Sequence, residues 1–134
     1  MLEIAGLDHI VLRSARPERL VTFYRDVLGC AVERESSTSL GLVQLRAGDS
    51  LIDIVSVDGE IGRRGGRAPG REGRNLDHFC LFLNTFDEAA IREHLLAHGV
   101  DPGDTVERYG ARGTDPSIYI EDPDGNTVEI KGPA

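Results

Sequence analysis

Two histidines and two carboxylates occupy matching places in the two halves of the chain. The six-residue segment LDHIVL returns 69 residues later as LDHFCL, which puts His9 and His78 at equivalent positions. Each half also closes on an apolar run with a single carboxylate, Asp53 in the first and Glu129 in the second. Imidazole nitrogens and carboxylate oxygens together suit Zn²⁺, Fe²⁺, Ni²⁺, Co²⁺ or Mn²⁺ and leave coordination positions for water. The repeat therefore predicts one shared divalent metal site.

Each of these residues also has an ordinary structural interpretation. A single histidine on an apolar strand is more often a hydrogen-bonded core residue than a ligand, but two at equivalent repeat positions favour ligation. Asp53 and Glu129 are flanked by β-branched residues, where a buried carboxylate without a partner is costly, so each requires a cation or metal. His94 and His98 are expected near the C-terminal end of the second helix, where a surface role that offsets the helix dipole is favoured over ligation.

Two modules with the same order of elements must position these side chains. Residues 7–13 alternate as a strand requires, with His9 and Arg13 on one face. Pro17 and an apolar stripe that stops at Gly29 predict an amphipathic helix of about 12 residues. Three strands are expected over residues 31–35, 40–46 and 50–57, with a hairpin turn at 47–49.

The second module repeats this order. A strand over residues 76–83 precedes a helix that begins at a capping box of Thr85 and Glu88 and ends at Gly99. Strands over residues 105–109, 117–121 and 126–131 follow, the last two joined by a type I turn at Asp122–Gly125. We therefore expect one α+β domain over residues 1–134, made of module 5–57, connector 58–74 and module 75–132.

The connector differs in composition from the modules. It holds seven glycine or proline residues and five arginines: Arg63, Arg64, Arg67, Arg71 and Arg74. Such a segment is not expected to form a core element, and we expect a mobile, solvated connector. Its positive charge would also suit a lid that meets an anionic ligand, and both interpretations stay open.

Composition limits the class of protein. The 134 residues are 40% hydrophobic and 28% charged, which suits one soluble domain. No apolar run approaches the length of a membrane span and no signal pattern opens the chain, so a cytoplasmic protein without membrane contact is expected. A net charge of −8 argues against nucleic acid as a partner. Cys30 and Cys80 both lie in apolar stretches and are expected to be buried, reduced thiols.

Three longer motifs resemble the vicinal oxygen chelate superfamily, which includes glyoxalase I, fosfomycin-resistance thiol transferases, extradiol dioxygenases and bleomycin-resistance proteins. The motifs are LDHIVL at the start, FYRDVLG at residues 23–29 and SIYIEDPDGNTVE at residues 117–129. The resemblance implies two βαβββ modules whose curled mixed sheets enclose a cup, with a divalent metal held by His9, His78 and Glu129. Asp53 matches the position of a fourth ligand in glyoxalase I, which is a glutamate there. Within the superfamily the chain is most similar to glyoxalase-domain and virulence-associated proteins.

Three functions follow from this resemblance. In a glyoxalase-type isomerase or lyase, the metal chelates two neighbouring oxygens of a small substrate, an enediolate is stabilised, and Glu129 or Asp53 moves a proton. In an Fe²⁺ extradiol-type dioxygenase, His9, His78 and Glu129 form the metal triad and Asp53 stays outside it. In a binding protein of the bleomycin-resistance type, the cup holds a small molecule without metal.

Three further residues are candidates for substrate binding. Arg13 shares a strand face with His9 and could bind a substrate carboxylate, whereas Tyr109 and Arg112 lie in a glycine-flanked loop at the expected mouth of the cup. Alternatively, Arg13 pairs with a surface acid and the loop only connects strands. Because an open cup exposes sheet edges and members of the superfamily commonly dimerise, we also expect a homodimer.

Overall fold

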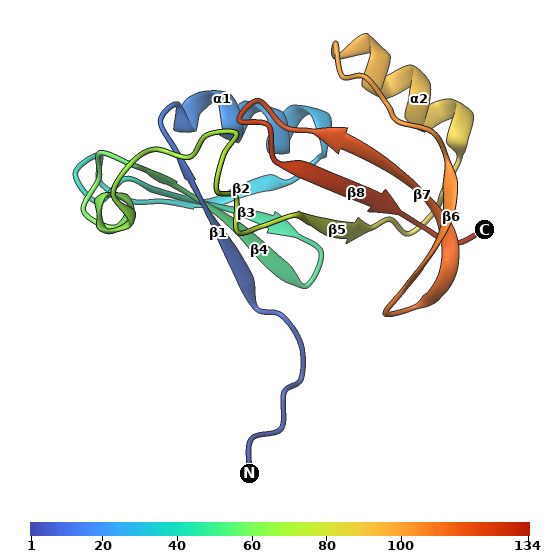
Figure 1. The fold of residues 1–134 in the computed structure, drawn as a ribbon, viewed down its shortest axis with the longest axis horizontal. Helices are drawn as coiled ribbons and strands as arrows, with labels where there is room; N and C mark the ends of the chain where they lie inside the picture. Colours follow the sequence, from blue (N-terminus) through green and yellow to red (C-terminus); the bar gives the residue numbers. More distant parts are fainter. The chain divides into compact units, whose positions relative to one another are not determined.

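Each half of the chain forms a four-stranded mixed sheet with one helical segment between its first two strands, as Figure 1 shows. The computed structural model describes residues 1–134, which divide into unit 1 (residues 1–69) and unit 2 (residues 70–134). The α+β class and the strand, helix, three-strand order of each half are confirmed. No helix in the chain is long and apolar enough to span a bilayer.

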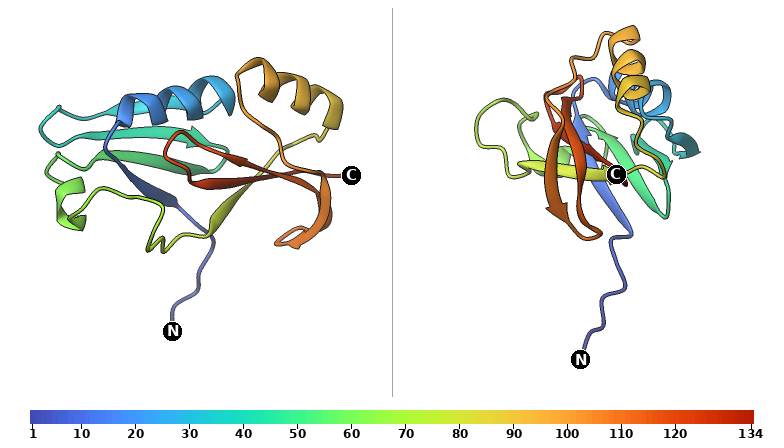
Figure 2. Two further views of the ribbon diagram at one scale, coloured as in Figure 1. Left: turned by 45° about the horizontal axis from the view of Figure 1, so that its top comes forward. Right: turned by 90° about the vertical axis from the view of Figure 1, so that its right-hand side faces the viewer.

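The sheet of unit 1 has the strand order β1-β4-β3-β2. Its strands are β1 (His9–Ser14), β2 (Ala31–Glu35), β3 (Leu42–Ala47) and β4 (Ser50–Ser56). β1 and β4 run parallel, and the other neighbours run antiparallel. Strand alternation gives the sheet one apolar face, which includes Leu12, Leu45, Ile52 and Ile54, all buried. The first helical segment lies along this sheet in the left view of Figure 2. The opposite face is mixed: it carries His9, Arg13 and Asp53 together with apolar residues such as the buried Val55.

The first helical segment changes its winding part way along. α1 (Pro17–Thr22) continues directly into the π-helical turn η1 (Phe23–Val27), and Gly29 follows at φ 73°. Proline in the first turn and glycine at the end are as predicted. A single α-helix was the wrong expectation for the second half, because the Leu28 amide donates to the Phe23 carbonyl five residues back (3.3 Å). The wider turn buries both Phe23 and its neighbour Tyr24, whose rings are in edge-to-face contact.

The sheet of unit 2 has the strand order β5-β8-β7-β6. Its elements are β5 (His78–Phe82), α2 (Glu88–Ala97), β6 (Val106–Gly110), β7 (Gly113–Glu121) and β8 (Thr127–Lys131). Ile118, Ile120, Val128 and Ile130 form its apolar face and are buried. β5 and β8 run parallel, as β1 and β4 do in unit 1. The two units therefore share a topology as well as a sequence motif.

The second helix begins differently from the prediction. Asp87 is the N-cap, and its carboxylate accepts a hydrogen bond from the Ala90 amide (3.1 Å), so the capping box of Thr85 and Glu88 was wrong. Glu88 is the first helical residue, and its carboxylate binds Thr105 and Arg92 instead. Gly99 follows the helix at φ 71°, as predicted, and the two histidines near this end are exposed.

The connector is more ordered than its composition indicates. η2 (Gly62–Gly65) is a 3₁₀ helix, and a Cβ atom on Gly62 would lie 1.8 Å from the Ser56 carbonyl oxygen. Glycine is thus required for this segment to pack against the end of β4. Close backbone contact thus takes the place of apolar side chains in this first part of the connector.

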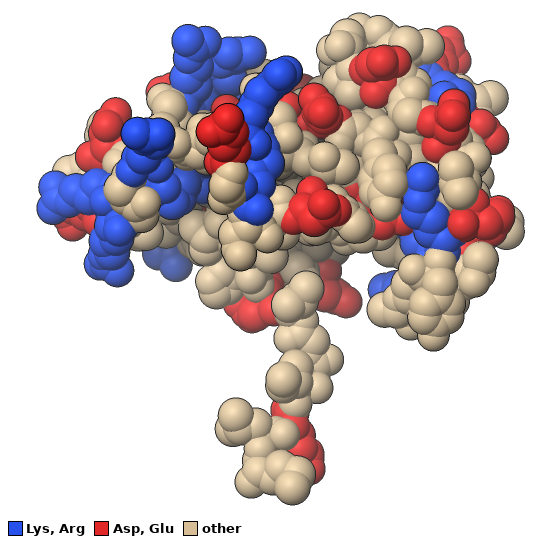
Figure 3. Space-filling model, in the orientation of Figure 1, with Lys and Arg blue, Asp and Glu red and all other residues tan.

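Charge is unevenly divided between the units. Unit 1 holds nine lysines and arginines against ten acidic residues, whereas unit 2 holds six against thirteen. Figure 3 shows basic side chains gathered over the end of unit 1 from which the connector loop extends. Nearly all of the net negative charge therefore belongs to unit 2.

Candidate functional site

The mixed face of the unit 1 sheet, opposite its apolar face, carries the first two predicted ligands. Val11 and Asp53 are partners in the β1-β4 ladder, and His9 precedes Val11 by two residues, so His9 and Asp53 share a face. Asp53 is 4% exposed, whereas the His9 side chain is 46% exposed. The structure thus places the buried carboxylate and the accessible imidazole on one surface of unit 1.

Asp53 has a partner that the sequence did not reveal. Gln44 lies opposite Asp53 on β3, and its side-chain amide donates to both carboxylate oxygens at 3.3 and 3.2 Å. This contact fixes the orientation of the carboxylate, and it also shows that Asp53 does not depend on a metal for a polar partner.

The corresponding face of unit 2 carries the other two predicted ligands in contact with each other. Cys80 and Glu129 are partners in the β5-β8 ladder, and His78 precedes Cys80 by two residues. Nε2 of His78 lies 3.5 Å from a carboxylate oxygen of Glu129, which is 7% exposed. A histidine nitrogen and a carboxylate oxygen therefore converge on one point of this face.

Both histidines are oriented in the same way by the preceding residue. Nδ1 of His9 lies 2.6 Å from the Asp8 carboxylate, and Nδ1 of His78 lies 2.6 Å from the Asp77 carboxylate. An ionised carboxylate only accepts hydrogen bonds, so Nδ1 carries the proton and Nε2 keeps the lone pair that can bind a metal. The same carboxylate–histidine arrangement orients metal-ligating histidines in many proteins. The repeated motif thus orients two histidine side chains in the same way.

The charge environment of two groups on these faces shifts their protonation. The hydrogen bond to Asp8, with help from the nearby Asp53 and Asp8 charges, raises the pKa of His9 above its usual value. Partial burial and the adjoining Glu129 carboxylate raise the pKa of the Cys80 thiol to about 11. Cys80 is exposed, which corrects the expectation that both thiols are buried; only Cys30 is. The reason is that Cys80 lies on the polar face of its strand.

Each unit offers nitrogen and oxygen donors, but no complete metal site. Nowhere in the chain do three or more histidine, cysteine or acidic side chains lie together in a group that could hold a metal ion. Each unit offers one Nε2 with a free lone pair and one buried carboxylate, the nitrogen and oxygen donors that Zn²⁺, Ni²⁺, Co²⁺, Fe²⁺ and Mn²⁺ accept.

The three candidate substrate-binding residues have different surroundings. Arg13 donates to the carbonyl oxygens of Gly62 (2.7 Å), Gly66 (2.6 Å) and Arg67 (3.0 Å), so it holds the connector rather than a surface acid. The guanidinium of Arg112 lies over the ring of Phe82, which shares the face of His78. Tyr109 is exposed and neighbours Arg108 on β6, so its side chain leaves the opposite face of that strand.

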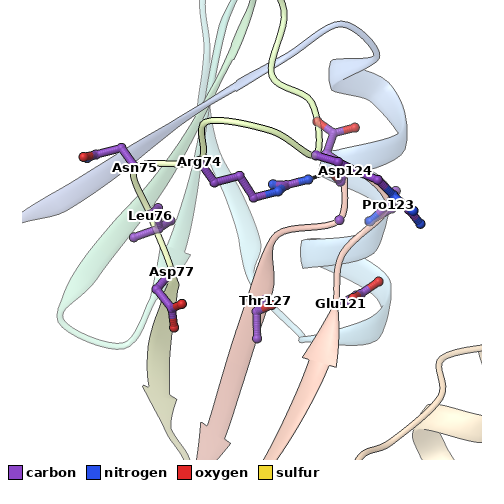
Figure 4. Close-up of a pocket in the computed structure, with 10 residues that line it drawn as sticks. Arg74, Asn75, Leu76, Asp77, Glu121, Pro123, Asp124 and Thr127 are labelled. Carbon is purple, nitrogen blue, oxygen red and sulfur yellow. Dashed lines mark hydrogen bonds between the residues drawn. The ribbon is translucent and has the colours of Figure 1, made fainter.

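A polar hollow of about 630 Å³ lies in unit 2, and its lining includes Asp77 and Thr127. It lies where β5 and β8 begin and β7 ends, and Figure 4 shows Arg74 reaching across it toward Asp124. Arg74 donates to the Asp124 carbonyl (3.1 Å) and the Asn126 side chain (3.3 Å). Oδ2 of Asp124 is buried without a hydrogen-bond partner.

Several polar residues of the unit 2 face escaped the sequence analysis. They are Cys80, Arg108, Ser117, Tyr119 and Lys131, and the strand register places them on the face of Glu129. Lys131 is 3% exposed, donates to the Gly113 carbonyl (2.5 Å) and lies 4.0 Å from Asp115. The alternation of side chains along β8 could have identified Lys131, because it lies two residues after Glu129 and therefore on the same face.

Comparison with known proteins identifies the family of the chain. The model of the Glyoxalase/Bleomycin resistance protein/Dioxygenase superfamily matches residues 6–130. The chain belongs to this superfamily. A curated relative, virulence protein STM3117 of Salmonella typhimurium, is 30% identical over 128 residues, which cover 95% of this chain and 83% of the relative. The resemblance stated from the motifs is therefore confirmed.

Solved structures of superfamily members share the fold. An integron cassette protein from the mobile metagenome of V. cholerae superimposes with a TM-score of 0.78 and 26% identity, covering 100% of this chain and 99% of that one. Lactoylglutathione lyase from Agrobacterium tumefaciens gives a TM-score of 0.67 at 20% identity, covering 96% and 94% of the two chains. The second likeness concerns the fold alone.

Proposed function

We propose that this superfamily member is a metal-dependent enzyme of the glyoxalase type, which acts on a small substrate with two neighbouring oxygens by isomerase or lyase chemistry. In this proposal His9, His78, Glu129 and Asp53 hold one Zn²⁺, Ni²⁺, Co²⁺, Fe²⁺ or Mn²⁺ ion. The observation that carries it is the repeated Asp–His pair, with Nδ1 bound at 2.6 Å in both units and Nε2 left for ligation. When bound, the metal would chelate the substrate oxygens and stabilise negative charge that develops on them.

The side chains of the protein supply proton transfer and orientation. Asp53 is buried and held by the amide of Gln44, which leaves further lone pairs on its oxygens to accept a proton from a substrate carbon. Glu129 is the second candidate base, because it lies on the accessible polar face of its sheet beside His78. The hollow lined by Asp77, the residue that orients His78, gives a small polar molecule room to bind in unit 2.

A second candidate function is an Fe²⁺ dioxygenase, and the Gln44 contact favours it. If the hydrogen bonds from Gln44 keep the Asp53 carboxylate away from the metal, the remaining ligands are His9, His78 and Glu129. This is a set of two histidines and one carboxylate. The metal itself and the behaviour of Asp53 variants separate the two candidates.

The test is the metal content per chain of protein purified without a histidine tag. His9→Ala, His78→Ala and Glu129→Ala are expected to lose the metal, whereas His94→Ala, at an exposed histidine, keeps it. Asp8→Asn and Asp77→Asn are expected to weaken metal binding by roughly 10- to 100-fold, because they remove the groups that orient the imidazoles. Loss of metal in Asp53→Ala supports four ligands, and retention supports the dioxygenase triad. No metal after reconstitution would refute both enzymes and leave a small-molecule binding protein.

We further propose that the chain acts as a homodimer in the cytoplasm, with small molecules rather than nucleic acid or membranes as its partners. Its net charge of −8 supports the exclusion of polyanions. Light scattering at micromolar concentration measures the mass of the assembly, and a monomer there would contradict the dimer.

A further inference from the structure

Arg108 on β6 is held in one orientation from two sides. Its Nη1 donates to the hydroxyl (2.6 Å) and the carbonyl (3.2 Å) of Ser117, and its guanidinium carbon lies 4.1 Å from the centre of the Tyr119 ring. Ser117 is completely buried, and its hydroxyl donates onward to the Val106 carbonyl (3.3 Å). Because the residues that fix it are strand residues, the guanidinium is preorganised.

The charge of Arg108 is not neutralised within unit 2. Asp115 is its partner in the β6-β7 ladder, but the Asp115 carboxylate lies toward Lys131 at 4.0 Å. The two hydrogen bonds of the guanidinium use Nη1 alone, which leaves the N–H groups of Nε and Nη2. Two such donors in a fixed plane match the two oxygens of a carboxylate.

Tyr119 connects Arg108 to the proposed metal ligands of unit 2. Its ring is in edge-to-face contact with His78, with 5.2 Å between the ring centres, and Tyr119 lies opposite Glu129 in the β7-β8 ladder. The guanidinium carbon of Arg108 lies 4.1 Å from the centre of the same Tyr119 ring, so it lies at most about 9 Å from the centre of the His78 imidazole. A single small molecule of roughly five carbon atoms is long enough to reach both groups.

We propose that Arg108 is a specificity-determining residue that selects small substrates with a carboxylate at the end remote from the chelating oxygens, of the 2-oxo dicarboxylic acid class. Tyr119 forms the wall between the two ends of the substrate. A carboxylate is favoured over a phosphate or phosphonate because one guanidinium edge neutralises a single charge and unit 2 carries thirteen acidic residues against six basic ones. This inference rests on the proposed function, since it assigns the chelating end of the substrate to the metal.

The test compares the binding of two probes by titration calorimetry in the presence of Mn²⁺. 2-Oxoglutarate and 2-oxobutyrate have the same chelating end, but only the first carries a remote carboxylate. We expect the wild type to prefer 2-oxoglutarate at least about tenfold, a difference typical of one bidentate charged contact. Arg108→Gln should remove the preference without weakening 2-oxobutyrate binding, and Arg108→Lys should restore only part of it. The control is Arg34→Gln, at an exposed arginine on β2, which should behave as the wild type.

Other results would overturn either the role of Arg108 or the proposed function on which it rests. A preference that persists in Arg108→Gln, or no binding of 2-oxoglutarate to the wild type at millimolar concentration, overturns the proposal. Stronger competition by inorganic phosphate than by succinate overturns the choice of a carboxylate. Failure of Mn²⁺ and of the other four candidate ions to bind the wild type refutes the proposed function instead, and a separate metal titration distinguishes the two failures.

Discussion

Removing the side chain of Arg13 should open the connector without unfolding the sheet beneath it. Arg13→Ala deletes three hydrogen bonds to the carbonyl oxygens of Gly62, Gly66 and Arg67. A hydrogen bond from a charged donor contributes about 1.5–3 kcal/mol when desolvated. Two of these three bonds are exposed, so about 1 kcal/mol for each is appropriate, or roughly 3 kcal/mol for the anchor as a whole. The population of the opened connector should therefore rise by about 100-fold.

Limited proteolysis with trypsin measures this opening directly, because the connector contains its own cleavage sites. The rate of cleavage after Arg63, Arg64 and Arg67, followed by mass spectrometry, should rise by about 100-fold in Arg13→Ala. The midpoint of urea unfolding should change much less, since the apolar face of the sheet is untouched. Arg19→Ala is the matched control, because Arg19 is exposed and makes no hydrogen bond with its side chain.

The refuting result is an equal cleavage rate in Arg13→Ala and Arg19→Ala. A coupled variant sharpens the test: a Cβ atom on Gly65 would lie 2.4 Å from the guanidinium carbon of Arg13. Gly65→Ala should accelerate cleavage in the wild-type background but add little once Arg13 is already alanine, because both changes break the same contact. Additive effects would show that Arg13 does not anchor the connector.

Two further predictions concern unit 2. In metal-free protein at pH 8, alkylation of Cys80 should be about tenfold slower than that of a free cysteine. Its pKa of about 11 rather than 9.0 makes the thiolate roughly 100-fold rarer. A more basic thiolate is also a stronger nucleophile, which offsets part of this loss of rate. The rate should still be rising at pH 10, and a plateau below that pH would contradict the assignment. Asp122→Ala removes the acceptor of three hydrogen bonds from Asp124 and Asn126 (2.8–2.9 Å) and should lower the free energy of unfolding in urea by about 2–3 kcal/mol. A loss no larger than that of Asp104→Ala, at an exposed acid, would show that these bonds do not hold the turn.

The order of elements could be predicted because the chain contains it twice. The repeated motif, the helix-ending glycines and the turn at Asp122–Gly125 all marked boundaries that the structure confirms. The errors came where two local signals competed. At the second helix, Asp87 is nearer to the first helical residue than Thr85 and so provides the cap. In the connector, close packing of glycine against backbone is invisible in composition.

The candidate site could be predicted only as far as strand alternation reaches. Alternation places His9 with Arg13 and Glu129 with Lys131, and it identifies the two carboxylates as interior groups. The partners of these residues depend on the register between strands. Gln44 meets Asp53, and Arg108 meets Tyr119, because β3 and β6 align in one register among several that the sequence allows. The carbonyl groups that hold Arg13 belong to no side chain and leave no mark in the sequence.

The π-helical turn at Phe23–Val27 has a consequence for how this segment can vary in length. A π turn accommodates one more residue than an α turn over the same rise, and here that residue allows two consecutive aromatic rings to face the interior. Deleting one residue between Thr22 and Leu28 would restore ordinary winding and still leave Gly29 to end the helix. Only one of the Phe23 and Tyr24 rings would then remain buried. Length differences at this point should therefore be absorbed by the winding of the helix, with the strands on either side keeping their places.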